Sequence, residues 1–69
     1  MTIYIETLSP HPIYGNLHCH IVYGPDGRER YKAWGDSRAH ADYCLAAMVE
    51  VEDPGATQIN LPKGEVSPV

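Results

Sequence analysis

Residues 17–48, LHCHIVYGPDGRERYKAWGDSRAHADYCLAAM, decide the fold, because two alternating segments, a turn and an amphipathic segment follow one another there. Apolar and polar residues alternate over residues 16–23 and again over residues 29–34, which is the period of a half-buried strand. Between them, Pro25 presets φ at the second position of a turn, and Gly27 accepts the left-handed conformation of a bulge. The stretch therefore predicts a β-hairpin followed by a helix.

The turn also predicts the register of the hairpin. With Gly27 as the bulge residue, the apolar side chains of both strands fall on the face toward the helix, and the polar side chains fall on the other face. The turn chemistry and the alternation are independent signals, and their agreement supports the hairpin. The expected pairs are Ile21 with Tyr31, Cys19 with Ala33, His20 with Lys32 and His18 with Trp34.

The helix is expected to begin after Asp36 or Ser37 as the N-cap and to extend to about Val51. Its apolar residues recur at i, i+3, i+4 and i+7, which places them on one face against the sheet. Asp53-Pro54-Gly55 stops the helix. The apolar stripe consists of Ala41, Cys44, Leu45 and Met48.

Residues 2–8 and 57–61 are predicted to be a first and a last strand, and residues 62–69 a flexible tail. The order strand, hairpin, helix, strand (β-β-β-α-β) predicts an α+β fold. We expect an antiparallel sheet of three or four strands with one helix packed on one face. At 69 residues the whole chain, 1–69, is one small domain.

The bulk composition narrows the classes of function. A net charge of −4 and a pI near 5.3 disfavour nucleic-acid binding over the whole surface. Two cysteines are too few for a secreted disulfide scaffold, and no apolar run reaches the ~20 residues of a membrane span. The N-terminal residues lack the pattern of a signal peptide. We therefore expect a cytoplasmic protein without membrane contact.

The sheet face opposite the helix is the candidate binding surface. It should expose aromatic, imidazole and basic side chains together, a combination that is unusual for a surface that only meets water. We expect a protein partner or self-association there. The runner-up hypothesis is a nucleic-acid module, because basic and aromatic side chains on an open sheet can stack bases. The candidate binding residues are Tyr4, His18, His20, Arg30, Lys32 and Trp34.

A second candidate surface is acidic. Glu50, Glu52 and Asp53 cluster at the end of the helix, where the helix dipole favours cations instead. The simpler interpretation is that these carboxylates only face solvent. The more specific alternative is that they contact a basic partner. The cluster is the secondary binding candidate.

No metal, cofactor or enzyme activity is expected. His18 and His20 lie two apart on a strand, and His40 and Cys44 lie four apart on the helix, both of which are ligand spacings. The predicted sheet separates the two pairs, so we expect no metal site. No catalytic motif occurs, and Cys19 and Cys44 are expected to be buried in the core, with a disulfide as the open alternative.

Two resemblances follow from these features. Residues 35–41, GDSRAHA, resemble the start of the last helix of a double-stranded-RNA-binding domain, Ser-Lys-Lys-x-Ala-Lys, through Ser37 and Ala41. Ala39 and Asp42 replace lysines that contact phosphates in that family. The resemblance implies the topology and, as an alternative function, a small nucleic-acid-binding module.

The whole chain is similar in size, acidity and element order to small inhibitor proteins of phages and mobile elements, the anti-CRISPR proteins among them. This likeness implies a non-enzymatic protein that blocks a host protein or ribonucleoprotein complex by surface occlusion.

Overall fold

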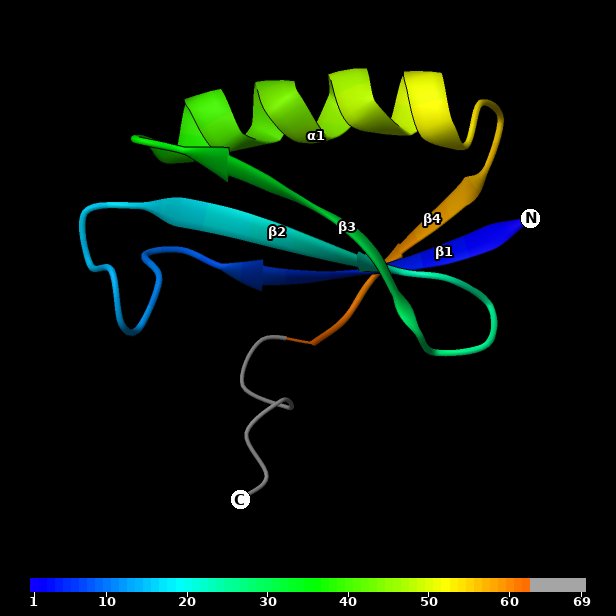
Figure 1. The fold of residues 1–69 in the computed structure, drawn as a ribbon, viewed down its shortest axis with the longest axis horizontal. Coiled ribbons are helices and arrows are strands. Elements are labelled where there is room, and N and C mark those ends of the chain that lie inside the picture. The colour runs from blue at the N-terminus through cyan, green and yellow to red at the C-terminus, as the bar shows by residue number, and fades with distance from the viewer. Residues whose placement is uncertain (63–69) are drawn as a thin grey trace.

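A computed structural model describes residues 1–62 of the chain. Its element order is β1 (Thr2–Leu8), β2 (His18–Tyr23), β3 (Glu29–Gly35), α1 (Arg38–Glu52) and β4 (Thr57–Asn60). The four strands form one sheet in the order β3-β2-β1-β4, and α1 lies along one side of it (Figure 1). The predicted α+β fold is therefore confirmed. Of the predicted tail, residues 63–69 lie outside the described part.

The sheet is antiparallel except at one edge. β1 pairs with β2 and β2 with β3 in antiparallel fashion. β4 runs parallel to β1 after the chain has crossed over through α1, and all four of its residues are exposed. The expectation of a wholly antiparallel sheet is wrong at this strand, because the helix returns the chain to the starting end of β1.

The core lies between α1 and the middle of the sheet. Ile3, Ile5 and Val22 from the strands and Val49 from the helix are buried there. Tyr31, Leu45 and Ala56 pack against them at the margins. Val49 continues the predicted stripe by one turn.

The helix begins at the predicted place. Ser37 is the N-cap, and its hydroxyl accepts a hydrogen bond from the backbone N–H of His40 at 3.1 Å. The first turn lies directly on Gly35: a Cβ built there would stand 2.3 Å from the backbone nitrogen of Ala41. Glycine at the end of β3 therefore sets how closely the helix approaches the sheet.

The predicted hairpin exists, but its register is wrong beyond the first pair. Tyr23 pairs with Glu29, as the turn chemistry requires. A bulge then leaves Arg30 unpaired on β3, and Val22 faces Tyr31. Every later pair is shifted by one residue, and a shift of one moves each side chain of β2 to the other face. The observed pairs are Val22 with Tyr31, Ile21 with Lys32, His20 with Ala33, Cys19 with Trp34 and His18 with Gly35.

Because of this shift, the predicted assignment of side chains to the two faces of β2 is wrong. His18, His20 and Val22 belong to the face toward α1, whereas Cys19 and Ile21 belong to the face away from it. On β1 and β3, Tyr4, Lys32 and Trp34 lie opposite the helix as predicted, whereas the prediction for Arg30 is wrong because it is the bulge residue and bonds to Asp53 at the end of α1.

Candidate functional site

The most exposed aromatic cluster lies on the sheet face away from the helix. The Trp34 ring contacts the His11 ring at a centroid distance of 5.3 Å, and the Tyr14 ring stands edge-on to Trp34 at 6.5 Å. Trp34 is 39% exposed, Tyr14 55% and the neighbouring Ile13 77%. We call these four residues, His11, Ile13, Tyr14 and Trp34, the aromatic surface.

The loop between β1 and β2 holds the aromatic surface in place. The backbone N–H of His11 bonds to the carbonyl of Leu17 at 2.8 Å, which closes the loop. The Nδ1 atom of His11 accepts hydrogen bonds from the backbone N–H groups of Ile13 and Tyr14, both at 3.1 Å. These bonds brace the loop backbone around the His11 ring, which contacts Trp34.

Cys19 lies beneath this cluster. It is the cross-strand neighbour of Trp34 and is only 1% exposed. Burial raises the pKa of its thiol above the usual value. The expectation that Cys19 packs in the same core as Cys44 is wrong, because the sheet separates Cys19 from the helix. Both thiols are free, so the alternative of a disulfide is excluded in this structure.

Two tyrosines continue the face toward the β4 edge. Tyr23 donates a hydrogen bond to Glu6 at 2.6 Å, and this bond, together with burial, raises the pKa of Tyr23 to about 12. Tyr4 lies beside Tyr23 on the neighbouring strand. The face opposite the helix therefore presents several aromatic side chains but few charges.

The basic candidate residues form ion pairs within the chain. Arg30 does not stay on the open face; its guanidinium forms two hydrogen bonds with Asp53, at 2.7 and 3.0 Å. Lys32 lies 3.7 Å from Glu29. Cations that are already paired have less to offer to phosphate groups.

The contact between Arg30 and Asp53 also sets Asp53 apart from the other two residues of the acidic candidate cluster. Asp53 is only 7% exposed and accepts a third hydrogen bond from the Tyr31 hydroxyl at 2.8 Å. Burial opposes its ionisation, but the bonds from Arg30 and Tyr31 outweigh burial and lower the pKa of Asp53. Glu50 and Glu52 remain exposed. Asp53 therefore has a structural role at the end of α1 that the charge pattern did not reveal.

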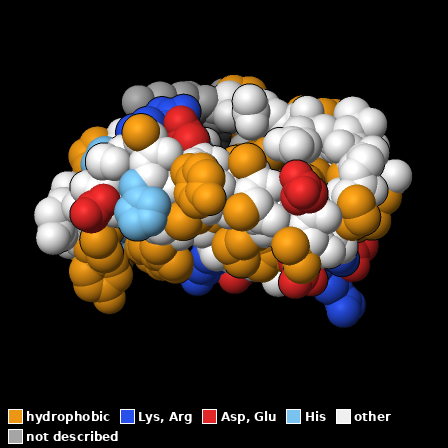
Figure 2. Space-filling model, turned by 90° about the horizontal axis from the view of Figure 1, so that it is seen from above, with side chains coloured by type: hydrophobic (Ala, Val, Ile, Leu, Met, Phe, Trp, Pro, Cys, Tyr) orange, Lys and Arg blue, Asp and Glu red, His pale blue; other side chains and the backbone are white. Residues whose placement is uncertain are grey.

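The outward side of α1 is the other apolar area. Figure 2 shows hydrophobic side chains along this side of the molecule, and Tyr43 is 75% exposed. Nothing in the described residues indicates what covers it.

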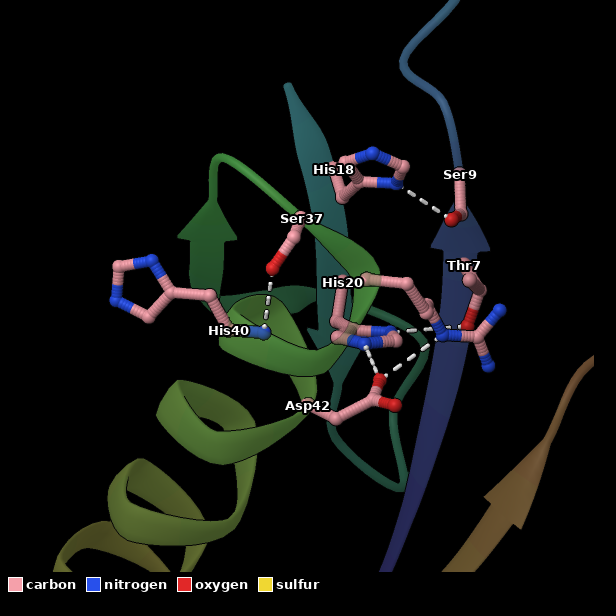
Figure 3. A network of polar contacts seen from close by, with 8 residues as sticks. Thr7, Ser9, His18, His20, Ser37, His40 and Asp42 are labelled. Carbon is pink, nitrogen blue, oxygen red and sulfur yellow. Dashed lines mark hydrogen bonds and ion pairs between the residues drawn. The ribbon is translucent and has the colours of Figure 1, made fainter. Parts of the chain in front are cut away.

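The face toward α1 contains a polar relay that sequence reasoning missed. His20, 2% exposed, places its Nδ1 atom 3.0 Å from the Thr7 hydroxyl and its Nε2 atom 2.6 Å from Asp42 (Figure 3). Asp42 also accepts a hydrogen bond from Nε of Arg38 at 3.0 Å. β1, β2 and α1 each contribute a member, and we call Thr7, His20 and Asp42 the relay.

The direction of the hydrogen bonds follows from the charge on Asp42. Burial opposes its ionisation, but hydrogen bonds from Arg38 and His20 outweigh burial and lower the pKa of Asp42. An ionised carboxylate can only accept, so Nε2 of His20 carries a proton. In the neutral imidazole Nδ1 is then an acceptor, and the Thr7 hydroxyl donates to it.

A neighbouring pair lacks the carboxylate. The Ser9 hydroxyl lies 2.7 Å from Nδ1 of His18. In sequence, Ser9 is two residues after Thr7 and His18 is two residues before His20, so this pair lies beyond Leu8 and Cys19. His40 shows the converse, since its Nδ1 atom lies 3.1 Å from Asp36 without a hydroxyl partner among the described residues. Among residues 1–62, only the His20 ring forms hydrogen bonds with both a hydroxyl and a carboxylate.

The relay opens into a cleft of about 500 Å³ beside α1. Because α1 covers β2 and β3, the N-terminal half of the helix forms one wall, and the β4 edge forms the other. This volume is in the range of small-molecule sites. Besides the relay, the lining includes Arg38, Leu45, Ala46, Gln58, Asn60 and Leu61.

No signal in the sequence joined these residues. Thr7 and Asp42 stand 13 and 22 positions from His20, and only the bulge at Arg30 turns His20 toward the helix. Within residues 1–62 no group of three potential metal ligands comes together. The described helix also lacks the length and apolarity for crossing a membrane.

Comparison with known proteins gave no relatives: no family model, curated protein or solved structure matches the chain.

Proposed function

We propose that the chain is a protein-interaction module that binds a host protein or ribonucleoprotein complex through the aromatic surface, as a phage or mobile-element inhibitor of the anti-CRISPR type would. The observation that carries the proposal is the exposed cluster of Trp34 with His11 and Tyr14. Large, rigid aromatic side chains lose little entropy on binding and are common hot spots of interfaces. Surface occlusion by such a module needs no chemistry.

The distribution of charge favours a protein over a nucleic acid as the partner. Arg30 and Lys32 are engaged with carboxylates, and Arg38 is bonded to Asp42. A net charge of −4 also disfavours a polyanion as the partner. A partner surface with apolar and basic groups complements both the aromatic rings and the negative charge.

The test begins with the tagged full chain as bait in extracts of a host cell, with cross-linking to identify the partner and the contact site. The purified partner is then titrated against the wild type, Trp34→Ala and Tyr43→Ala. We expect Trp34→Ala to weaken binding by about 2 kcal/mol, or ~30-fold. Tyr43→Ala, on the outward side of α1, should bind like the wild type.

Circular dichroism and thermal melting check that each variant is folded. Stronger weakening by Tyr43→Ala than by Trp34→Ala would place the interface on the helix and overturn the proposal. Binding to a single-stranded polynucleotide that weakens steeply with salt and depends on Arg28, Arg30 and Lys32 would favour the nucleic-acid alternative.

A further inference from the structure

The cleft beside α1 contains the elements of an acyl-transfer site. Nδ1 of His20 lies 3.0 Å from the Thr7 hydroxyl and Nε2 lies 2.6 Å from Asp42. With Asp42 ionised and the imidazole neutral, Thr7 donates to His20 and His20 donates to Asp42. A hydroxyl nucleophile, an imidazole base and a carboxylate that orients the base form the arrangement used for nucleophilic catalysis. Here Nδ1 faces the hydroxyl and Nε2 faces the carboxylate, which is the reverse of the usual assignment in a serine hydrolase triad. The order of proton transfer is the same.

The surroundings of the relay fit a small ester. Leu45, Ala46 and Leu61 offer an apolar wall for an acyl chain, and the volume of about 500 Å³ accommodates one. Arg38 is the cation among the described lining residues, and only its Nε atom is used in the bond to Asp42, so the guanidinium can still approach a developing oxyanion. A fixed positive charge stabilises negative charge that develops on a carbonyl oxygen.

We propose that the cleft hydrolyses small carboxylic esters, with Thr7 as the nucleophile and His20 as the general base. The Thr7 oxygen forms a bond to the carbonyl carbon while His20 takes the hydroxyl proton. The carbon–oxygen bond to the alcohol then breaks, and His20 returns the proton to the departing alkoxide. Water next attacks the acyl-threonine, and His20 again accepts and returns one proton. The products are the acid and the alcohol, with the enzyme restored.

Asp42 is a positioning residue in this scheme, because its role is exerted through the imidazole of His20. Its carboxylate fixes the tautomer in which Nδ1 can accept the Thr7 proton. The activity is independent of the aromatic surface, which lies on the other face of the sheet.

The experiment measures hydrolysis of 4-nitrophenyl acetate and 4-nitrophenyl butyrate by the full chain, together with the intact mass of the protein after a short exposure. We expect a transient acyl adduct that maps to Thr7. Thr7→Val preserves the shape of the side chain but lacks the hydroxyl, and should lower the rate by ~100-fold. Thr7→Ser should keep the activity. Asp42→Asn should lower the rate while the ester concentration at half-maximal rate stays the same.

The chain supplies matched controls for unspecific imidazole chemistry. His18→Asn removes the imidazole bonded to a hydroxyl alone, and His40→Asn the imidazole bonded to a carboxylate alone. Both variants should retain the wild-type rate within about twofold. Protein unfolded in urea gives the background.

The proposal is overturned if the folded protein is no faster than the urea-unfolded protein. It is equally overturned if Thr7→Val, shown to be folded by circular dichroism, matches the wild type, or if the acyl group maps elsewhere. In those cases the relay is a structural network only.

Discussion

Arg30 and Asp53 join the hairpin to the end of the helix by two hydrogen bonds, from Nε to Oδ2 at 3.0 Å and from Nη2 to Oδ1 at 2.7 Å. The backbone N–H of Asp53 also bonds to the carbonyl of Val49, so the residue closes the last turn of α1. Tyr31 adds a third side-chain bond to the same carboxylate. A bulge residue, a strand residue and a helix C-cap are thus held at one point.

Asp53→Asn should destabilise the protein at neutral pH, because it leaves Arg30 without a charged partner. Asp53→Asn should lower the melting temperature more than Asp26→Asn does, since Asp26 lies in the exposed hairpin turn. Thermal melts followed by circular dichroism give both values. Equal melting temperatures for the two variants would show that the contact adds no stability.

Acid should weaken the same contact. The native pKa of Asp53 is lower than the usual 3.8, so the unfolded chain binds a proton more readily. The stabilisation is therefore present above pH 3.8 and is lost as the pH falls through the lower native value. Urea unfolding between pH 5 and pH 2 should show a smaller loss of stability for Asp53→Asn than for the wild type. Equal losses of stability in the wild type and in Asp53→Asn would contradict the lowered pKa of Asp53.

High pH should lower the stability of the protein through ionisation of Tyr23 and Tyr31. The pKa values of Tyr23 and Tyr31 are raised to about 12 from the usual 10.0, so the native state holds these protons more tightly than the unfolded state. Stability is therefore complete below pH 10 and falls as the pH rises toward 12. Tyr23→Phe and Tyr31→Phe should each flatten this fall in urea titrations. An unchanged slope in both variants would count against the two hydroxyl contacts.

The elements of the fold were predictable because their signals are local. The turn at Gly24-Pro25-Asp26-Gly27, the cap at Ser37 and the period of the apolar residues each act within a few residues. The register was not, because nothing in the local pattern marks the bulge at Arg30, whose partner Asp53 lies 23 residues away. A one-residue slip changes every face assignment of a strand. The alternating pattern indicated the wrong face of β2, because the apolar Cys19 and Ile21 lie away from the helix, opposite Trp34 and Lys32.

The candidate site was predictable only in part for the same reason. Trp34 and Lys32 belong to β3, whose face assignment does not change, so both lie on the expected side. His18 and His20 belong to β2 and turn toward the helix. The partners of Trp34 come from a loop that is closed by the backbone bond from His11 to Leu17 and braced by the ring of His11, and no periodic pattern marks such a loop.

The close approach of helix and sheet at Gly35 can be tested directly. A Cβ at this position would meet the backbone of Ala41 at 2.3 Å, so the backbone itself must move. Gly35→Ala should cost about 2 kcal/mol or more, the size of an overpacked core. Gly15→Ala is the control, because no atom lies within 4 Å of its added Cβ. Urea unfolding gives both free energies, and similar losses would disprove the close contact.

Thiol reactivity should report on the aromatic surface. Cys44 is partly exposed on α1, whereas Cys19 is buried beneath Trp34 and has a raised pKa, which lowers the fraction of reactive thiolate. A disulfide reagent should therefore modify Cys44 in the folded protein and Cys19 only on unfolding. In the Cys44→Ala variant the folded chain should be nearly inert.

Removing the ring above Cys19 should expose it. Adding Trp34→Ala to Cys44→Ala should speed the modification of Cys19 by about tenfold or more, because the thiol then meets solvent without global unfolding. Adding Tyr43→Ala, on the far side of the molecule, should leave the rate unchanged. Stability is measured in parallel, so that faster labelling at unchanged stability identifies local exposure. If Trp34→Ala leaves Cys19 inert while the fold is intact, other atoms of the loop cover the thiol, and the Trp34 ring is not its lid.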